Sequence, residues 1–201
     1  MSTPPRAVIL DLGNVLVFHD NGLLFRRLGA RTGLAASEVE SRLAAGTGWT
    51  AANRGLLSAE GIRRDVCGSL GVDVPAEEFN ALWSSHFTPH EAVLPRVAGL
   101  VGRVKLALLS NTNVLHAAFL RPQLPVLERF DHVLLSCELG HVKPEPAFFQ
   151  EALRRLGCAP QEAVFFDDLP EFVQAANTLG IRGHLFTTAE SFDAQLRGLG
   201  L

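Results

Sequence analysis

Four polar segments of the sequence carry side chains that could bind a divalent cation and a phosphate together. Three directly follow apolar runs and the fourth lies in a loop; they are Asp11-Leu12-Gly13-Asn14, Ser110-Asn111, Lys143 and Asp167-Asp168. Carboxylates are the hard oxygen ligands that Mg²⁺ prefers, and neighbouring carboxylates repel one another unless a cation lies between them. Lysine adds a compact positive charge that suits a phosphate. These residue types indicate a cation and phosphate site if the fold brings the segments together.

Each segment taken alone also has a structural interpretation. Asp11 is a common turn residue, and Ser110 and Asn111 are residue types that cap helices. A lone loop lysine is usually solvated, and the aspartate pair would stabilise the positive end of a helix dipole. The functional interpretation therefore depends on all four segments lying at one edge of the fold.

Five short apolar runs predict the strands that position these segments. The runs do not alternate with polar residues, which is typical of parallel strands buried on both faces. They cover residues 7–12, 104–109, 132–135, 163–166 and 183–186. Helices are expected at about 113–121, 145–156, 170–179 and 188–198. This order predicts a doubly wound, mostly parallel, Rossmann-like α/β sheet, in which ligands bind at the carboxyl ends of the strands.

A long stretch after the first strand interrupts this alternation. Its helix start signals are Ser37-x-x-Glu40, Ser58-x-Glu60 and Pro75. We expect residues 18–89 to form a helical cap inserted into an α/β core of residues 1–17 and 90–201. Thr88-Pro89 and Leu94-Pro95 are expected to mark the return to the core.

Composition excludes several classes of protein. The chain has 201 residues, of which 47% are hydrophobic, and a net charge of −3, so it can bury a sizeable core and is not disordered. The absence of a basic run argues against nucleic acid or a membrane surface as a partner. Three widely spaced cysteines and no signal-peptide core favour a cytoplasmic protein with reduced thiols, either a monomer or a homodimer.

In this order, the motifs resemble those of the haloacid dehalogenase-like (HAD) hydrolase superfamily over nearly the whole chain. Asp11 is similar to the family's nucleophile, and Ser110-Asn111 to its second motif. Lys143, in Lys-Pro-x-Pro-x-x-Phe, is similar to the third motif, and Phe166-Asp167-Asp168 to the fourth. The long gap after the first motif matches the family's habit of inserting a helical cap. Asp-Leu-Gly-Asn-Val is similar to the first motif of capped sugar-phosphate phosphatases.

The resemblance implies a Mg²⁺-dependent phosphatase that hydrolyses a small phosphorylated metabolite, a sugar or nucleotide phosphate, through an aspartyl-phosphate on Asp11. The metal ligands that it implies are Asp11, the backbone carbonyl of Gly13, and the Asp167-Asp168 pair. Asp168 is expected to make the direct contact, and Asp167 to bind Lys143 or a metal-bound water. The phosphate-binding residues that it implies are Gly13, Ser110, Asn111 and Lys143.

One position departs from the family's usual pattern. Most HAD phosphatases have a second aspartate, the general acid and base, where this chain has Gly13. The proton could instead come from His19 or Asp20, from a metal-bound water, or from no donor if the leaving group is good. A metal-independent 2-haloacid dehalogenase, which also lacks that aspartate, remains an alternative, although the Asp167-Asp168 pair disfavours it. A catalytically weak binding or regulatory protein is a second alternative.

Two further pairs of residues carry weaker signals. His86 and His90 are four residues apart, but Pro89 lies between them and no third ligand is near in the sequence, so a zinc site is disfavoured. Trp49 and Trp83 are expected in the core of the cap. Trp49 lies beside two glycines and could instead line the substrate pocket.

Overall fold

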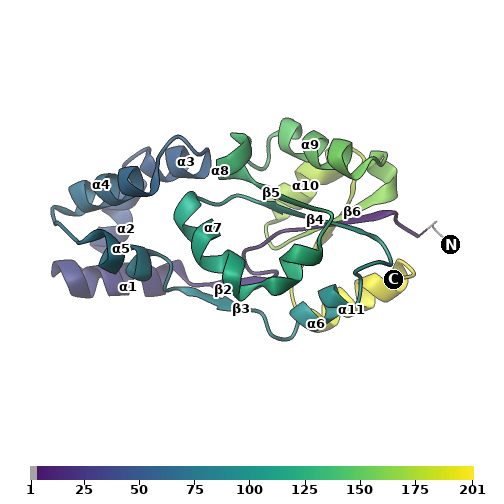
Figure 1. Cartoon of the computed structure of the whole chain (residues 1–201), viewed down its shortest axis with the longest axis horizontal. Helices are drawn as coiled ribbons and strands as arrows, with labels where there is room; N and C mark the ends of the chain where they lie inside the picture. The colour runs from purple at the N-terminus through teal and green to yellow at the C-terminus, as the bar shows by residue number, and fades with distance from the viewer. Residues whose placement is uncertain (1–3) are drawn as a thin grey trace.

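A five-stranded parallel sheet forms the centre of the molecule (Figure 1). The structure is a computed structural model that describes residues 4–201. The strands, in sheet order, are β5 (His132–Leu135), β4 (Lys105–Ser110), β1 (Ala7–Leu10), β6 (Ala163–Asp167) and β7 (Arg182–Leu185). The chain runs outwards from β1 through β4 to β5 and then crosses to β6 and β7. The strand order therefore reverses around β1, which is where doubly wound sheets bind ligands.

Helices cover both faces of this sheet because alternate strand residues point to opposite sides. On one face Val8 and Leu10 of β1 contribute to a buried cluster with α6 and α11, and on the other Ala7 and Ile9 pack with α9 and α10. The helices of this part are α6 (Leu94–Ala98), α7 (Val114–Leu120), α8 (Ser136–Leu139), α9 (Pro146–Leu156), α10 (Pro170–Thr178) and α11 (Ala189–Gly198). Short 3₁₀ turns are η1 (Arg121–Gln123), η2 (Pro125–Arg129) and η3 (Pro160–Glu162). The predicted fold class is confirmed.

Five further helices lie beyond one end of the sheet (Figure 1). They are α1 (Asn21–Thr32), α2 (Ala36–Ala44), α3 (Gly48–Asn53), α4 (Ala59–Leu70) and α5 (Ala76–Trp83), and we call them the helical segment. They surround a buried cluster of their own, which includes Leu24, Val66 and Phe79. The antiparallel pair β2 (Val17–His19) and β3 (Phe87–Pro89) connects this segment to the sheet. The domain limits given above remain a prediction, and residues 1–3 of the expected core lie outside the described residues.

Three local expectations are wrong. Helix α2 begins after Ala35, which makes no side-chain cap, so Ser37 is not the start signal, whereas Ser58 does cap α4. Leu94-Pro95 begins α6 instead of forming a hinge, because proline is favoured in a first helical turn. The cap of α7 is Asn113, whose Oδ1 accepts hydrogen bonds from two backbone N–H groups. Ser110 and Asn111 are therefore not helix caps.

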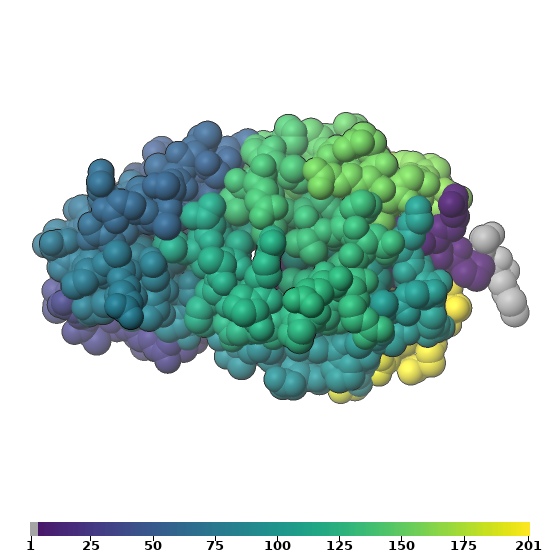
Figure 2. All heavy atoms as spheres, viewed as in Figure 1, coloured from purple at the N-terminus to yellow at the C-terminus, as the bar shows by residue number. Residues whose placement is uncertain are grey.

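The helical segment also packs against two helices that flank the sheet. Helix α3 contacts α8, and α5 contacts α7 (Figure 2). All three cysteines are free. Within residues 4–201, no helix combines the length and apolar character needed to cross a membrane.

Candidate active site

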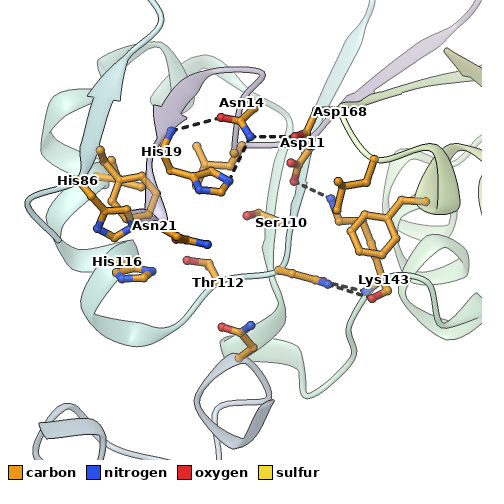
Figure 3. A pocket seen from close by; sticks show the side chains of 18 of the residues that line it. Asp11, Asn14, His19, Asn21, His86, Ser110, Thr112, His116, Lys143 and Asp168 are labelled. Atoms are coloured by element: carbon orange, nitrogen blue, oxygen red, sulfur yellow. Dashed lines mark hydrogen bonds and ion pairs between the residues drawn. The ribbon is translucent and has the colours of Figure 1, made fainter. Parts of the chain in front are cut away.

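A cavity of about 320 Å³ lies where the carboxyl ends of the strands face the helical segment (Figure 3). The sheet part contributes Asp11, Gly13, Asn14, Ser110, Asn111, Thr112, Lys143 and Asp168 to its lining. The helical segment and its connecting strands contribute His19, Asn21, Trp49, Asn53, His86 and Phe87. The structure thus gathers all four polar segments of the sequence at one place.

Lys143 lies at the centre of the charged end of this cavity. Its Nζ donates to Asp11 Oδ1 at 2.5 Å and to Asp167 Oδ2 at 2.6 Å, and only 3% of the residue is exposed. Asn111 positions the loop, since its amide nitrogen donates to Lys143 O and its oxygen accepts from Lys143 N. Burial alone would lower the pKa of Lys143, but the two carboxylates outweigh it and the pKa is raised. Lys143 is therefore held in its charged form.

Three carboxylates cluster at this end of the cavity, and two of them, Asp11 and Asp167, pair with Lys143. Carboxylate oxygens of Asp11, Asp167 and Asp168 all lie within 4.8 Å of one another. Burial raises the pKa of Asp11 in spite of Lys143, and raises that of Asp167 to about 6. The fully ionised cluster has two negative charges that no side chain in it neutralises. This hard oxygen donor set fits a divalent cation such as Mg²⁺.

His19 occupies the space beside Gly13. A Cβ atom placed on Gly13 would lie 3.0 Å from His19 Cδ2 and 3.2 Å from its Nε2. Asn14, in the left-handed region at φ 52°, accepts from the His19 backbone N–H, and its amide nitrogen lies 3.3 Å from His19 Nε2. The same amide nitrogen donates to Asp168 Oδ2 at 2.8 Å. Asn14 thus connects the imidazole to the carboxylate cluster, a role that the sequence analysis missed.

Asp20 is engaged elsewhere. Its Oδ1 accepts from Leu23 N as the cap of α1, and its Oδ2 pairs with Arg26 at 3.3 Å. Asp20 does not line the cavity. Of the two residues considered as proton carriers, only His19 faces the carboxylates.

The far end of the cavity contains residues that sequence reasoning did not place there. His86 and His116 both line it, together with Thr112, and Trp49 lies beside them as one alternative anticipated. His90 instead stacks on Phe18, with ring centroids 4.0 Å apart. Among the described residues, the aspartate cluster is the only group of three side chains close enough to hold a metal ion, and no third ligand lies beside His86 and His90. Nothing in the sequence spacing links His86 to His116.

The helical segment touches the loop that carries Lys143. Arg54, after α3, donates to Gly140 O at 3.3 Å and forms an ion pair with Glu145. A Cβ atom on Gly55 would lie only 2.0 Å from the carbonyl oxygen of Cys137, so the two parts are in backbone contact there. Glu145 in turn accepts from the backbone N–H of Val142. These contacts therefore join the helical segment to the loop of residues 140–145, which carries Lys143 and which we call the lysine loop.

Comparison with known proteins agrees with this geometry. The family model of haloacid dehalogenase-like hydrolases matches residues 5–180. This chain belongs to that family. The predicted membership of the HAD-like superfamily is thereby confirmed, and the protein is a hydrolase by family.

Relatives carry several functional names. The chain is 26% identical over 181 residues to D-ribitol-5-phosphate phosphatase of Bacteroides thetaiotaomicron, covering 86% of this chain and 87% of that protein. It is 29% identical over 194 residues to acyl-CoA dehydrogenase family member 10 of Mus musculus, covering 88% of this chain but only 17% of the mouse protein. A HAD family enzyme of B. thetaiotaomicron, solved with magnesium and inorganic phosphate, superposes with a TM-score of 0.83 at 24% identity, covering 91% and 94% of the two chains.

Proposed function

We propose that this protein is a Mg²⁺-dependent phosphatase that hydrolyses a small phosphorylated metabolite through an aspartyl-phosphate intermediate. The observation that carries the proposal is the convergence of Asp11, Asp167 and Asp168 around Lys143 in one cavity. A dehalogenase that works without metal has no use for three clustered carboxylates. The relative named as a sugar-alcohol phosphatase, matched over most of both chains, supports the same reaction class.

The residues that would hold Mg²⁺ are Asp11, Asp168 and the backbone carbonyl of Gly13, with Asp167 bound to Lys143. When bound, the cation would neutralise the repulsion between the carboxylate nucleophile and the phosphate anion. The hydrogen bond from Asn14 to Asp168 orients one of these carboxylates. Second hydrogen bonds of this kind tune metal ligands in many proteins.

The side chains of the cavity divide the work between nucleophile and charge stabilisation. Asp11 would attack phosphorus with a carboxylate oxygen, which divides one difficult displacement into two easier ones. Lys143, fixed by Asn111, would stabilise the charge on the transferring group. Ser110, which is 2% exposed and ends β4, would donate its hydroxyl to a non-bridging oxygen together with the Asn111 backbone N–H.

His19 is the candidate for the proton step that an aspartate at position 13 performs in other family members. Its Nε2 lies 3.2 Å from the place that the Cβ atom of such a side chain would take, and that Cβ atom would lie 3.8 Å from Asp11 Oδ2. Asn14 Oδ1 accepts from the His19 backbone N–H, so the Asn14 amide nitrogen donates to Nε2, which carries no proton in this arrangement. Once that contact opens, Nε2 would take a proton from the attacking water and return it to the leaving oxygen of the next ester.

Release of inorganic phosphate from p-nitrophenyl phosphate tests the proposal directly. We expect turnover with Mg²⁺, loss of turnover in EDTA, and recovery when Mg²⁺ is restored. The wild-type protein is compared with Asp11→Asn under each condition. Halide release from 2-chloropropionate in EDTA would favour the dehalogenase alternative. Absence of any Asp11-dependent turnover would favour a binding protein.

The natural substrate is expected to be a sugar or nucleotide phosphate. A panel of phosphorylated metabolites, assayed at equal concentration with Mg²⁺, ranks candidates by kcat/KM. The cavity volume of about 320 Å³ is at the small end of ligand pockets and favours a small leaving group. No activity above background on the panel would count against a metabolite phosphatase.

A further inference from the structure

Arg54 reaches from the helical segment to both ends of the lysine loop. The loop begins at Gly140, which ends α8, and finishes at Glu145, which precedes α9. Arg54 donates to Gly140 O at 3.3 Å and forms an ion pair with Glu145. One side chain of the helical segment therefore bridges the two points between which Lys143 lies.

The Glu145 carboxylate carries this contact to the backbone next to Lys143. One of its oxygens pairs with Arg54, and the other accepts from the Val142 backbone N–H at 3.2 Å. The Glu145 backbone N–H closes the same turn by donating to Val142 O at 2.8 Å. The hydrogen bonds from Arg54 and from Val142 hold the pKa of Glu145 below its usual value, so the carboxylate is charged at neutral pH. A charged acceptor makes a stronger hydrogen bond than a neutral one.

Lys143 is thus held from two sides. On the side of the sheet, the Asn111 side chain exchanges two hydrogen bonds with the Lys143 backbone. On the other side, the loop is held by Glu145 and, through it, by Arg54. Lys143 Nζ lies 2.5 Å from Asp11 Oδ1, so a small displacement of the loop moves the positive charge away from the nucleophile. Displacements of about 1 Å at a reacting group can lower the rate of an enzyme by about 100-fold.

An ion pair near the surface usually contributes little, but this one has two special features. The side chains of Arg54 and Glu145 are each only 34% exposed, so water screens the pair incompletely. The next residue, Gly55, is in backbone contact with Cys137 of α8, and α3 packs against α8 (Figure 1). The backbone next to Arg54 is therefore already in place, and less conformational entropy is lost when the guanidinium binds the loop.

The helix that precedes Arg54 also faces the cavity. Trp49 and Asn53 of α3 both line it, and Arg54 follows directly after the last residue of that helix. An ester whose leaving group contacts Trp49 or Asn53 would therefore touch the element that holds the lysine loop.

We propose that Arg54 is a positioning residue that keeps the Lys143 ammonium beside Asp11 by holding both ends of the lysine loop. This inference rests on the proposed phosphatase function and gives the helical segment a part in its reaction step. Arg54 does not line the cavity, so it acts on the reaction only through the loop. Its contribution belongs to kcat more than to KM, because Lys143 stabilises charge that develops in the transition state.

The variant Arg54→Met tests the role of the guanidinium, since it keeps a long side chain but removes both contacts. We expect kcat for p-nitrophenyl phosphate with Mg²⁺ to fall about tenfold, while KM changes less than about twofold. Arg31→Met is the matched control. Arg31 pairs with Glu78 at 2.6 Å and its side chain is 45% exposed, but this ion pair lies within the helical segment. The control should have the kcat of the wild type.

Two further substitutions show whether the contacts act as one unit. Arg54→Lys keeps the charge but not the forked guanidinium, so it should recover only part of the lost kcat. Glu145→Gln should lower kcat about threefold, and adding it to Arg54→Met should cause no further loss, because both residues act through one contact. Additive losses in the double variant would contradict the proposal.

Hydrogen exchange measures the loop without any substrate. The Val142 backbone N–H should exchange about tenfold faster in Arg54→Met than in the wild type, and at an unchanged rate in Arg31→Met. Melting temperatures confirm that the variants are folded. Unchanged exchange in Arg54→Met would overturn the proposal. Faster exchange with an unchanged kcat would leave Arg54 with a structural role and would also overturn it. A wild type that hydrolyses no ester would refute the phosphatase function, and the exchange rates would then decide the coupling by themselves.

Discussion

The two ends of the cavity differ in the charge of their buried polar groups. At the sheet end, Lys143 pairs with Asp11 and Asp167, and each group is fixed by loops that follow strands. At the far end, burial lowers the pKa values of His86 and His116, so both rings are neutral, and the Trp83 backbone acts against this on each. Substituting one partner of a buried ion pair is costly, because the other partner is then left as an unpaired buried charge.

The two histidines are different, because a neutral ring that loses a hydrogen bond leaves no buried charge. We expect the sheet end to govern the reaction step and the far end to influence which ester is accepted. Substitutions made at one end of the cavity at a time should therefore differ in the size of their effect on activity.

Asp11→Asn should have the largest effect on activity. The amide keeps the size of the carboxylate but cannot form the acyl-phosphate, so kcat should fall on the order of 10⁴-fold or more. Phosphate release from p-nitrophenyl phosphate measures this, with circular dichroism as the check on folding. Residual activity within tenfold of the wild type would mean that Asp11 is not the nucleophile.

Lys143→Met should lower kcat/KM by about 10²- to 10³-fold, because it removes positive charge from the transferring phosphate. It should also destabilise the metal-free protein, since Asp11 and Asp167 would be buried without their counter-charge. Added Mg²⁺ should then raise the melting temperature of the variant more than that of the wild type.

The chain offers a matched control for Lys143, because its only other lysine is Lys105. Lys105 Nζ donates to Leu156 O and lies outside the cavity. Lys105→Met should leave kcat/KM unchanged. Equal losses in the two lysine variants would contradict a role for Lys143 in phosphate binding.

His19→Ala should lower kcat by about 10²-fold on esters with poor leaving groups, and less on p-nitrophenyl phosphate, whose leaving group needs no proton. Gly13→Asp alone would collide with the His19 ring, whereas His19→Ala makes room for it. The double variant should therefore recover activity that His19→Ala loses. A double variant no better than His19→Ala would show that the glycine is needed for the shape of the loop.

The smallest effect concerns stability against acid. His86 and His116 have pKa values lowered by burial to about 4 and about 3, below the usual 6.5, so their stabilising contribution is complete above pH 6.5. It is lost as the pH falls towards 4, because the unfolded chain takes up the protons first. Between pH 7 and pH 5 the loss should be about 2 kcal/mol per histidine. Urea unfolding measures it, and His116→Phe should flatten the pH dependence; an unchanged slope would argue against the buried neutral form.

Sequence patterns were sufficient for the sheet and for the charged end of the cavity. The five strands are found within about two residues of their expected positions because each is a continuous apolar run, a strong local signal. Asp11, Lys143 and Asp168 then follow from the rule that ligands bind at strand ends. The strands β2 and β3 were missed because three residues are too few to show any period.

The far end of the cavity could not be predicted in this way. His86 comes from the loop before β3, and His116 lies inside α7. Only the packing of α5 against α7 brings them together. A histidine among aromatic residues gives the same sequence signal whether its ring lies in the core or lines a cavity. Asn113 shows the same limit, since one side chain both caps α7 and contacts the His116 ring.

The backbone contact at Gly55 limits which residue can occupy that position. The carbonyl oxygen of Cys137, in α8, lies so near that even one methyl group on residue 55 would push the helical segment away from α8. The ion pair of Arg54, the neighbouring residue, with Glu145 also holds the helical segment against the lysine loop. The helical segment and α8 thus approach each other at Gly55 too closely to admit a methyl group, and the positive φ of 69° at Gly55 also favours glycine there. A Gly55→Ala substitution would therefore disturb the packing of the helical segment against α8, close to the lysine loop.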